Sequence, residues 1–240
     1  MTSFSNRNQT TTGNMAISFQ SSKTHNTWRK ILLALGLILL CLASFLADDA
    51  VAAVFRAVHC RRLSTVAFLL NQIGDWSFHS VAALIAAAIA WQMRRKELAR
   101  LLVTMVLASS MAGIAVNTVR LSSGRPRPST KVQDGFYGLQ KDGQWIVGKH
   151  SYQSFPSAHT ATATAFAGVA LFAGIRYGWL IALFGPLVGC ARIYSSAHHF
   201  SDVITATVIG LLFSQWAWNF AQERWHPKSE PLSESSMVPT

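Results

Sequence analysis

Three short segments of the chain concentrate arginine, histidine and aspartate at spacings that suit phosphate chemistry. They are Arg120 to Arg127, Pro156-Ser157-Ala158-His159, and Arg192 through His198 to Asp202. A guanidinium group is planar, permanently charged and able to bind phosphate oxygens through two parallel hydrogen bonds. Helix N-termini near Ser157 and Asp202 would add backbone N–H donors. These residue types predict an anion-binding pocket.

Two histidines in these segments are candidates for a nucleophile and an acid. His198 and Asp202 are four residues apart, so they share a helix face if the last apolar helix begins one turn early. Asp202 would then accept a hydrogen bond from one ring nitrogen and leave the other free to attack. His159 would act as the acid. A metal site on His198 and Asp202 is the weaker hypothesis, because no carboxylate–histidine set completes a tetrahedron.

The composition indicates what kind of structure must position these residues. Of the 240 residues, 50% are apolar and 13% charged, with 21 Lys+Arg against 10 Asp+Glu and a net charge of +11. So apolar a chain is not disordered over most of its length. The three cysteines are an odd number and do not form a disulfide scaffold. With so few charges, nucleic-acid binding is a poor explanation of the basicity. The pattern is typical of a membrane protein with basic loops.

Six apolar runs approach the length of a membrane span, roughly 17–25 residues. They are Ile31–Ala47, Trp76–Met93, Leu101–Val119, Thr160–Ile175, Tyr177–Ala191 (with Pro186 inside it) and Val203–Phe220. We therefore predict an all-α integral membrane protein, with a six-span domain at 29–221 and disordered cytoplasmic tails at 1–28 and 222–240. The first run could instead be a cleaved signal, and the fourth and fifth could be buried helices of a soluble protein.

The segments between the runs predict the orientation. Residues 48–75 contain an amphipathic stretch and are expected to form a helix at the membrane interface. The short basic loop 94–100 indicates the cytoplasmic side. Both termini are then cytoplasmic in a cell membrane, and the three chemical segments face outward, with a catalytic loop between spans three and four. Within that loop, Asp142-Gly143 predicts a hairpin turn.

In order and internal spacing, the three segments resemble the signature of the type 2 phosphatidic acid phosphatase superfamily, which also includes vanadium haloperoxidases. That signature is Lys, six residues, Arg-Pro; then Pro-Ser-Gly-His; then Ser-Arg, five residues, His, three residues, Asp. The chain keeps every internal spacing and departs from the signature at Arg120, Ala158 and Ala191. None of these departures removes a proposed nucleophile, acid or phosphate-binding arginine.

The resemblance implies a membrane phosphatase that hydrolyses a lipid phosphate or lipid diphosphate without a metal or cofactor. His198 would form a phosphohistidine, Asp202 would orient it, and His159 would protonate the leaving group. The phosphoryl oxygens would be bound by Arg120, Arg127, Ser157 and Arg192. His199 is expected to be a bystander. Arg125 lies off the pattern and would meet a second phosphate or a lipid headgroup, or be solvated.

Two alternative functions would use the same pocket. One is peroxidase-like chemistry with bound vanadate. The other is a non-catalytic protein that binds or moves an anionic lipid, which needs the arginines but not His198. For a phosphatase, undecaprenyl diphosphate, phosphatidylglycerol phosphate, phosphatidate and lipid A phosphate all present a suitable phosphoryl group.

Overall fold

The computed structural model describes the backbone of residues 11–225 and the side chains from residue 27 onward. The chain divides into two compact units, Met1–Ala43 and Ser44–Thr240. Helix α1 (Thr11–Phe45) supplies the described part of the first unit, and its segment Thr27–Phe45 is long and apolar enough to cross a membrane. The disordered tails predicted at 1–28 and 222–240 stay predictions, since residues 1–10 and 226–240 lie outside the described residues.

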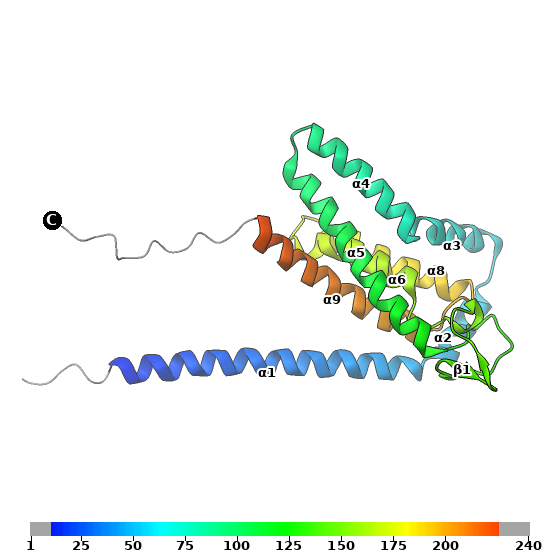
Figure 1. Ribbon diagram of the computed structural model, residues 1–240. Helices are drawn as coiled ribbons and strands as arrows, with labels where there is room; N and C mark the ends of the chain where they lie inside the picture. Colours follow the sequence, from blue (N-terminus) through cyan, green and yellow to red (C-terminus); the bar gives the residue numbers. More distant parts are fainter. Residues whose placement is uncertain (1–10, 226–240) are drawn as a thin grey trace, which may run out of the picture. The chain divides into compact units, whose positions relative to one another are not determined.

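The second unit is mostly helical, as the apolar runs predict (Figure 1). Its helices are α2 (Asp48–Ala57), α3 (Arg61–Ile73), α4 (Trp76–Gln92), α5 (Lys96–Ser123), α6 (Ala158–Phe172), α7 (Gly178–Ala182), α8 (Phe184–Tyr194) and α9 (Phe200–Trp225). The long connection between α5 and α6 also contains strands β1 (Gln140–Lys141) and β2 (Gln144–Trp145) and the 3-10 turn η1 (His150–Tyr152).

The two strands form the hairpin that Asp142-Gly143 predicts. Gln140 pairs with Trp145 in antiparallel register. Asp142 and Gly143 both have positive φ, 51° and 76°, which is the conformation of a two-residue hairpin turn of type I′. The turn prediction is confirmed.

The helices between the first and second apolar runs differ from the expectation. Two helices, α2 and α3, replace the single amphipathic helix expected in residues 48–75. Helix α3 meets α4 at an angle of 58°. Only the two helices taken together are long and apolar enough to cross a membrane as one bent span. The fifth run is also divided, since α7 ends at Ala182 and α8 begins at Phe184, ahead of Pro186. By length and apolarity, three helices among the described residues could cross a membrane, or four with the bent pair.

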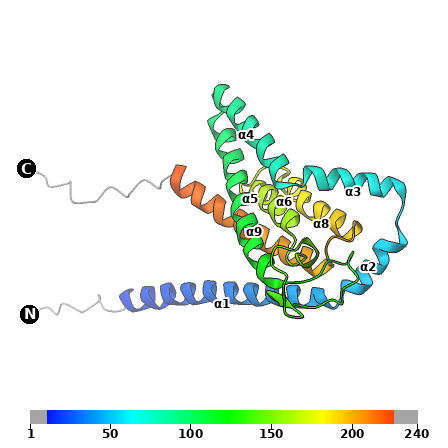
Figure 2. The ribbon, with the colours of Figure 1, turned by 45° about the vertical axis from the view of Figure 1, so that its right-hand side comes forward.

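Helix α6 is the centre of the second unit. It packs against α5, α7, α8 and α9, and Figures 1 and 2 show it among these helices from two directions. Ten of the 15 residues of α6 are buried, and these are alanine, threonine, glycine and valine. Small side chains let helix backbones approach closely where no hydrophobic force drives association in lipid. A Cβ on Gly210 of α9 would lie 2.8 Å from the carbonyl oxygen of Ala161.

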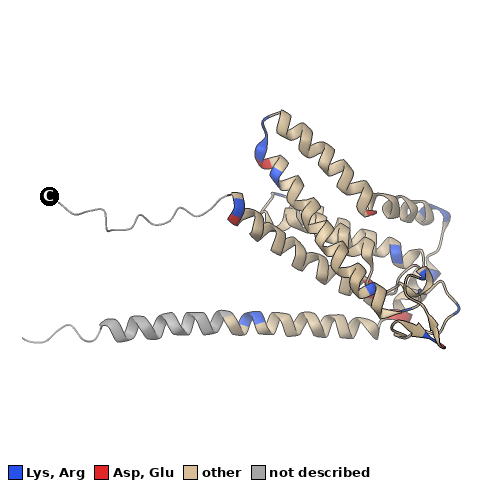
Figure 3. Cartoon of the chain, viewed as in Figure 1, with Lys and Arg blue, Asp and Glu red and all other residues tan. Residues whose placement is uncertain are grey.

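Charged residues lie mainly near the helix ends of the second unit (Figure 3). Arg94, Arg95 and Lys96 are at the α4–α5 turn, whereas Arg120 lies in the last turn of α5. Between these ends the exposed side chains of α4 and α5 include Leu84, Ile89, Val103 and Ile114. An apolar belt with charges at both ends suits a bilayer.

The close approach of α6 and α9 gives a stability prediction. Gly210→Ala adds a methyl group that meets the backbone of α6, and such overpacking costs about 1–3 kcal/mol, more than the ~1 kcal/mol that alanine gains in a helix. We expect a lower midpoint of thermal unfolding in detergent. In α1, Gly36 has nothing within 4 Å of an added Cβ, so Gly36→Ala is the matched control. Equal midpoints for the two variants would contradict this packing.

Candidate active site

The structure brings the three chemical segments together at one end of the helix bundle. Arg120 lies in the last turn of α5, His159 in the first turn of α6, Arg192 in the last turn of α8 and Asp202 in the first turn of α9. Electrostatic interactions join His159 to Arg120, Arg192 and His198. Residues more than 70 positions apart in the sequence therefore share one site.

The three predicted phosphate-binding arginines repel one another. Arg127 interacts with both Arg192 and Arg120, and burial together with these two charges lowers the pKa of Arg127 to about 10, so it stays protonated at neutral pH. Its Nε donates to the carbonyl oxygen of His150 at 3.0 Å. The buried Nε atoms of Arg120 and Arg192 have no hydrogen-bond partner among the described residues. Buried cationic donors of this kind are stabilised by an anion that accepts from them.

His198 is held in one tautomer by the backbone. Its side chain is 1% exposed, and its Nδ1 lies 2.7 Å from the carbonyl oxygen of Ser154. A carbonyl oxygen can only accept, so Nδ1 carries the proton and Nε2 keeps its lone pair. Asp202 Oδ2 is 3.6 Å from the same Nδ1. Asp202 therefore lies within ion-pair distance of His198, and its role in orienting the ring stays a prediction. Helix α9 begins at Phe200, so His198 precedes the helix.

The carboxylate of Asp202 also accepts hydrogen bonds from several other donors. Its Oδ2 accepts from the Ser154 hydroxyl at 2.5 Å and from the backbone N–H of His199 at 2.8 Å. The His199 ring also contacts Asp202, with Nδ1 3.3 Å from Oδ2. His199 therefore has a structural contact with Asp202, and its bystander role in catalysis stays a prediction. Asp202 fixes the turn that carries both histidines and places its charge beside His198.

Arg125 joins Asp202 to two distant carboxylates. Its side chain is 1% exposed, and its guanidinium donates to Asp202 Oδ1, Asp48 Oδ2 and both oxygens of Asp134 at 2.8–3.0 Å. Although burial opposes its charge, the carboxylates of Asp134, Asp202 and Asp48 raise the pKa of Arg125 above its ordinary value. The sequence suggested that Arg125 meets a phosphate or a lipid headgroup, or is solvated. In the structure Arg125 is instead a buried cation that pairs with carboxylates of the protein.

Two rings and a serine complete this cluster. The Arg125 guanidinium lies 5.0 Å from the ring centroid of Phe45 and 5.4 Å from that of Phe136, distances typical of cation–π contacts. Ser201 accepts from Arg125 at 2.7 Å and donates to Asp48 at 2.7 Å. The cluster therefore ties α2, the α5–α6 connection and α9 together behind the histidines.

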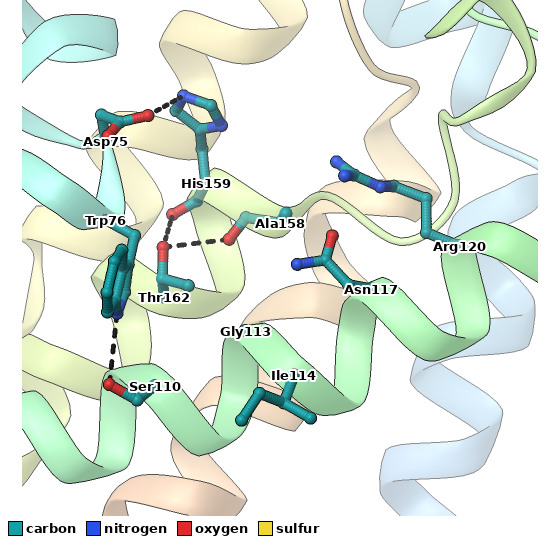
Figure 4. Close-up of a pocket in the computed structure, with 10 residues that line it drawn as sticks. All are labelled: Asp75, Trp76, Ser110, Gly113, Ile114, Asn117, Arg120, Ala158, His159 and Thr162. Atoms are coloured by element: carbon teal, nitrogen blue, oxygen red, sulfur yellow. Dashed lines mark hydrogen bonds and ion pairs between the residues drawn. The ribbon is translucent and has the colours of Figure 1, made fainter. Parts of the chain in front are cut away.

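His159 faces a pocket of about 430 Å³ between α4, α5 and α6. Figure 4 shows Ser110, Ile114, Asn117 and Arg120 in a row along one face of α5, with His159 on the opposite wall. Positions three and four apart share a helix face, so the pocket runs from the apolar middle of α5 to Arg120. A lipid chain would fit the apolar end and a phosphoryl group the basic end.

Ser157 and Ala158 begin α6 beside the site. The Ser157 side chain is fully buried and accepts from the Thr160 hydroxyl at 2.9 Å, while its backbone N–H donates to the backbone carbonyl oxygen of Asp202 at 3.3 Å. Ala158 does not adopt a positive φ, so alanine replaces the signature glycine without backbone strain.

Several residues of the site were not predicted. Ser154, Asp48, Asp134 and Ser201 fix the histidine turn, and Asp75 lies 3.5 Å from His159. Asp48 and Asp75 directly flank apolar runs, and Ser201 lies inside a signature segment, whereas Asp134 has no such signal. Such a signal does not specify the partner.

Comparison with known proteins identifies the family. Residues 97–226 match the PAP2 superfamily. Since this match covers more than half of the 240 residues, the chain belongs to the PAP2 superfamily. All three chemical segments lie within the matched range.

Individual relatives are more distant. Lipid phosphate phosphatase 1 of Arabidopsis thaliana is 23% identical over 194 residues, 65% of this chain and 59% of the relative. Undecaprenyl-diphosphatase BcrC of Bacillus subtilis (strain 168) is 38% identical over 68 residues, 27% of this chain and 35% of the relative. The chain thus spans less than two thirds of the length of these relatives.

Two solved structures share the fold. The PAP2-type phosphatidylglycerolphosphate phosphatase of Bacillus subtilis has a TM-score of 0.56 at 19% identity, covering 80% of this chain and 96% of that one. Aquifex aeolicus LpxE has a TM-score of 0.51 at 18% identity, covering 72% and 94%. At these identities the likeness establishes the architecture.

The burial of His198 gives a pH prediction. Burial, which outweighs the attraction of Asp202, lowers the pKa of His198 to about 4, against an ordinary value near 6.5. The ring is therefore neutral, and Nε2 nucleophilic, above about pH 4. In ¹⁵N-histidine NMR of the protein in detergent, the resonance lost in His198→Gln should titrate near pH 4. Titration near pH 6.5 would contradict a buried imidazole.

The carboxylate cluster gives a stability prediction. Arg125→Met leaves buried carboxylates without their cation, which costs about 3–5 kcal/mol. We expect a large drop in the thermal unfolding midpoint. Arg62 on α3 is exposed, so Arg62→Met should leave the midpoint near that of the wild type. Similar midpoints for the two variants would show that Arg125 does not hold the cluster together.

Proposed function

We propose that the protein is a membrane phosphatase that hydrolyses a lipid phosphate or lipid diphosphate through a phosphohistidine. One observation carries the proposal: the cations Arg127 and Arg192 lie close to the neutral His198, and Arg120 repels Arg127. A phosphoryl group would relieve the repulsion, and its negative charge in the transition state is best stabilised by fixed positive charge. The names of the relatives support a lipid phosphate as the substrate class.

The first step transfers the phosphoryl group to the enzyme. The Nε2 lone pair of His198 attacks phosphorus in line with the leaving oxygen, and the P–N bond forms as the P–O bond breaks. His159 gives its proton to the leaving lipid alkoxide, or to the leaving phosphate of a diphosphate. The three arginines, with Ser157 beside them, hold the phosphoryl oxygens, while the Ser154 carbonyl oxygen and Asp202 stabilise the charge that develops on His198.

The second step returns the enzyme to its starting state. A water molecule attacks phosphorus, and the neutral His159 ring now accepts its proton. The P–N bond breaks, its electron pair returns to Nε2 of His198, and inorganic phosphate leaves. Protonated His159 and neutral His198 are then ready for the next substrate.

The membrane arrangement belongs to the same proposal. Counting α1, α4, α5, α6, α7–α8 and α9 as crossings gives six spans, with α2 and α3 at the interface and both termini cytoplasmic. The site then faces away from the cytoplasm of a cell membrane at headgroup depth. The pocket that joins the apolar face of α5 to Arg120 supports a substrate that stays in the bilayer.

Phosphate release from purified protein in detergent tests the proposal. We expect release from at least one of undecaprenyl diphosphate, phosphatidylglycerol phosphate, phosphatidate and lipid A phosphate, and a loss of at least about 10³-fold in His198→Ala. His59, an exposed histidine at the start of the α2–α3 turn, provides the matched control His59→Ala, which should retain activity. Unchanged release in His198→Ala would refute the mechanism. Lipid binding without release in the wild type would favour the non-catalytic alternative.

A further inference from the structure

Asp75 lies at the corner between α3 and α4 and is the N-cap of α4. Its Oδ1 accepts from the backbone N–H of Ser77 at 3.0 Å and from the Ser77 hydroxyl. These hydrogen bonds are the main cause that holds the pKa of Asp75 below its ordinary value, so the carboxylate is ionised at neutral pH. Capping occupies one carboxylate oxygen and leaves the other available.

The second oxygen of Asp75 reaches the candidate acid. Asp75 Oδ2 lies 3.5 Å from Nε2 of His159, and the two side chains are 44% and 29% exposed. Both residues line the pocket that also contains Arg120. Figure 4 shows the other ring nitrogen of His159, Nδ1, turned away from Asp75 and toward the side of Arg120.

The positive charges around His159 disfavour its protonated form, and the carboxylate of Asp75 opposes their effect. Burial disfavours an imidazolium at this position, and Arg192 and Arg120 repel it, whereas Asp75 attracts it. A general acid must carry its proton before the leaving group departs. A carboxylate on one ring nitrogen also fixes the orientation of the ring and stabilises its protonated form.

The corner that carries Asp75 is fixed by tight packing against α8. A Cβ on Gly74 would lie 2.7 Å from both methyl carbons of Val188 and 2.7 Å from the carbonyl oxygen of Leu70. Val188 lies four residues before Arg192 on α8, so the two share one face of that helix. This packing therefore holds the corner that carries Asp75 next to α8, the helix that also supplies Arg192.

We propose that Asp75 is a positioning residue for His159, which holds the Nε2–H and directs Nδ1 to the leaving-group oxygen. The inference rests on the proposed phosphatase function and extends it. In the first step Nδ1 gives its proton to the leaving oxygen, while the other proton stays on Nε2 of His159 and is directed at Asp75. In the second step Nδ1 accepts the proton from water, so the carboxylate itself never exchanges a proton.

Asp75→Asn separates this role from helix capping. Asparagine caps a helix about as well as aspartate, so α4 keeps its N-terminus while the charge beside His159 is lost. The readout is kcat/KM for two leaving groups, the alkoxide of a lipid phosphate and the phenolate of p-nitrophenyl phosphate. An alkoxide needs a proton as it leaves, whereas a nitrophenolate leaves without one.

We expect Asp75→Asn to lose about ten- to hundred-fold in kcat/KM for the lipid phosphate and little for p-nitrophenyl phosphate. His159→Ala should show the same leaving-group pattern. The double variant should lose no more than His159→Ala alone, because Asp75 acts through His159. Asp49→Asn, on the exposed start of α2, is the matched control and should leave both substrates unaffected.

Three results would overturn this role. They are an Asp75→Asn variant as active as the wild type, an equal loss for both leaving groups with a lowered unfolding midpoint, and full additivity with His159→Ala. In each case the proposed function stands if the wild type releases phosphate. A wild type that releases phosphate from neither substrate would overturn the proposed function and the role of Asp75 together.

Discussion

The buried ion cluster around Arg125 is the interaction on which the rest of the site depends. One guanidinium, 1% exposed, binds Asp48 at the start of α2, Asp134 in the α5–α6 connection and Asp202 on α9. Three carboxylates around one cation are stable only when their remaining lone pairs are satisfied, and Ser154, Ser201 and the His199 backbone N–H supply those donors. The donors that satisfy Asp202 also fix the turn that carries His198. The same hydrogen bonds therefore balance the buried charges and hold the turn that carries the proposed nucleophile, His198.

The site uses two kinds of positive charge that differ in their partners. Arg125 donates hydrogen bonds to carboxylates and contacts aromatic rings with its guanidinium. Arg120 and Arg192 keep buried Nε donors without a partner in the described part of the chain, and both repel Arg127, whose charge Asp202 offsets in part. The first kind of charge stabilises the fold, and the second is the kind that we propose binds the phosphoryl group. The sequence difference is small, since Arg125 and Arg127 are separated by one proline.

How far the sequence predicts the structure depends on the range of each interaction. The hairpin at Asp142-Gly143 follows from local backbone preference, and the convergence of Arg120, His159 and Arg192 follows from helices that alternate in direction. The partners of Arg125 do not follow from either, because Asp48 and Asp202 are each 77 residues from it and no periodicity links them. The acceptor for His198 was also missed, since Ser154 provides a backbone carbonyl oxygen, which carries no residue-type signal. The start of α9 at Phe200 then placed His198 outside the helix, with its Nδ1 3.6 Å from Asp202 Oδ2.

The central claim is that the protein orients His198 to attack phosphorus through Nε2, with Nδ1 held by the carbonyl oxygen of Ser154. The most direct measurement is alkaline quenching of the enzyme during turnover of a ³²P-labelled lipid phosphate, followed by mapping of the labelled histidine and its ring isomer. We expect one labelled residue, His198, phosphorylated at Nε2. Label on His159 or His199, label at Nδ1 of His198, or phosphate release with no labelled histidine would contradict it.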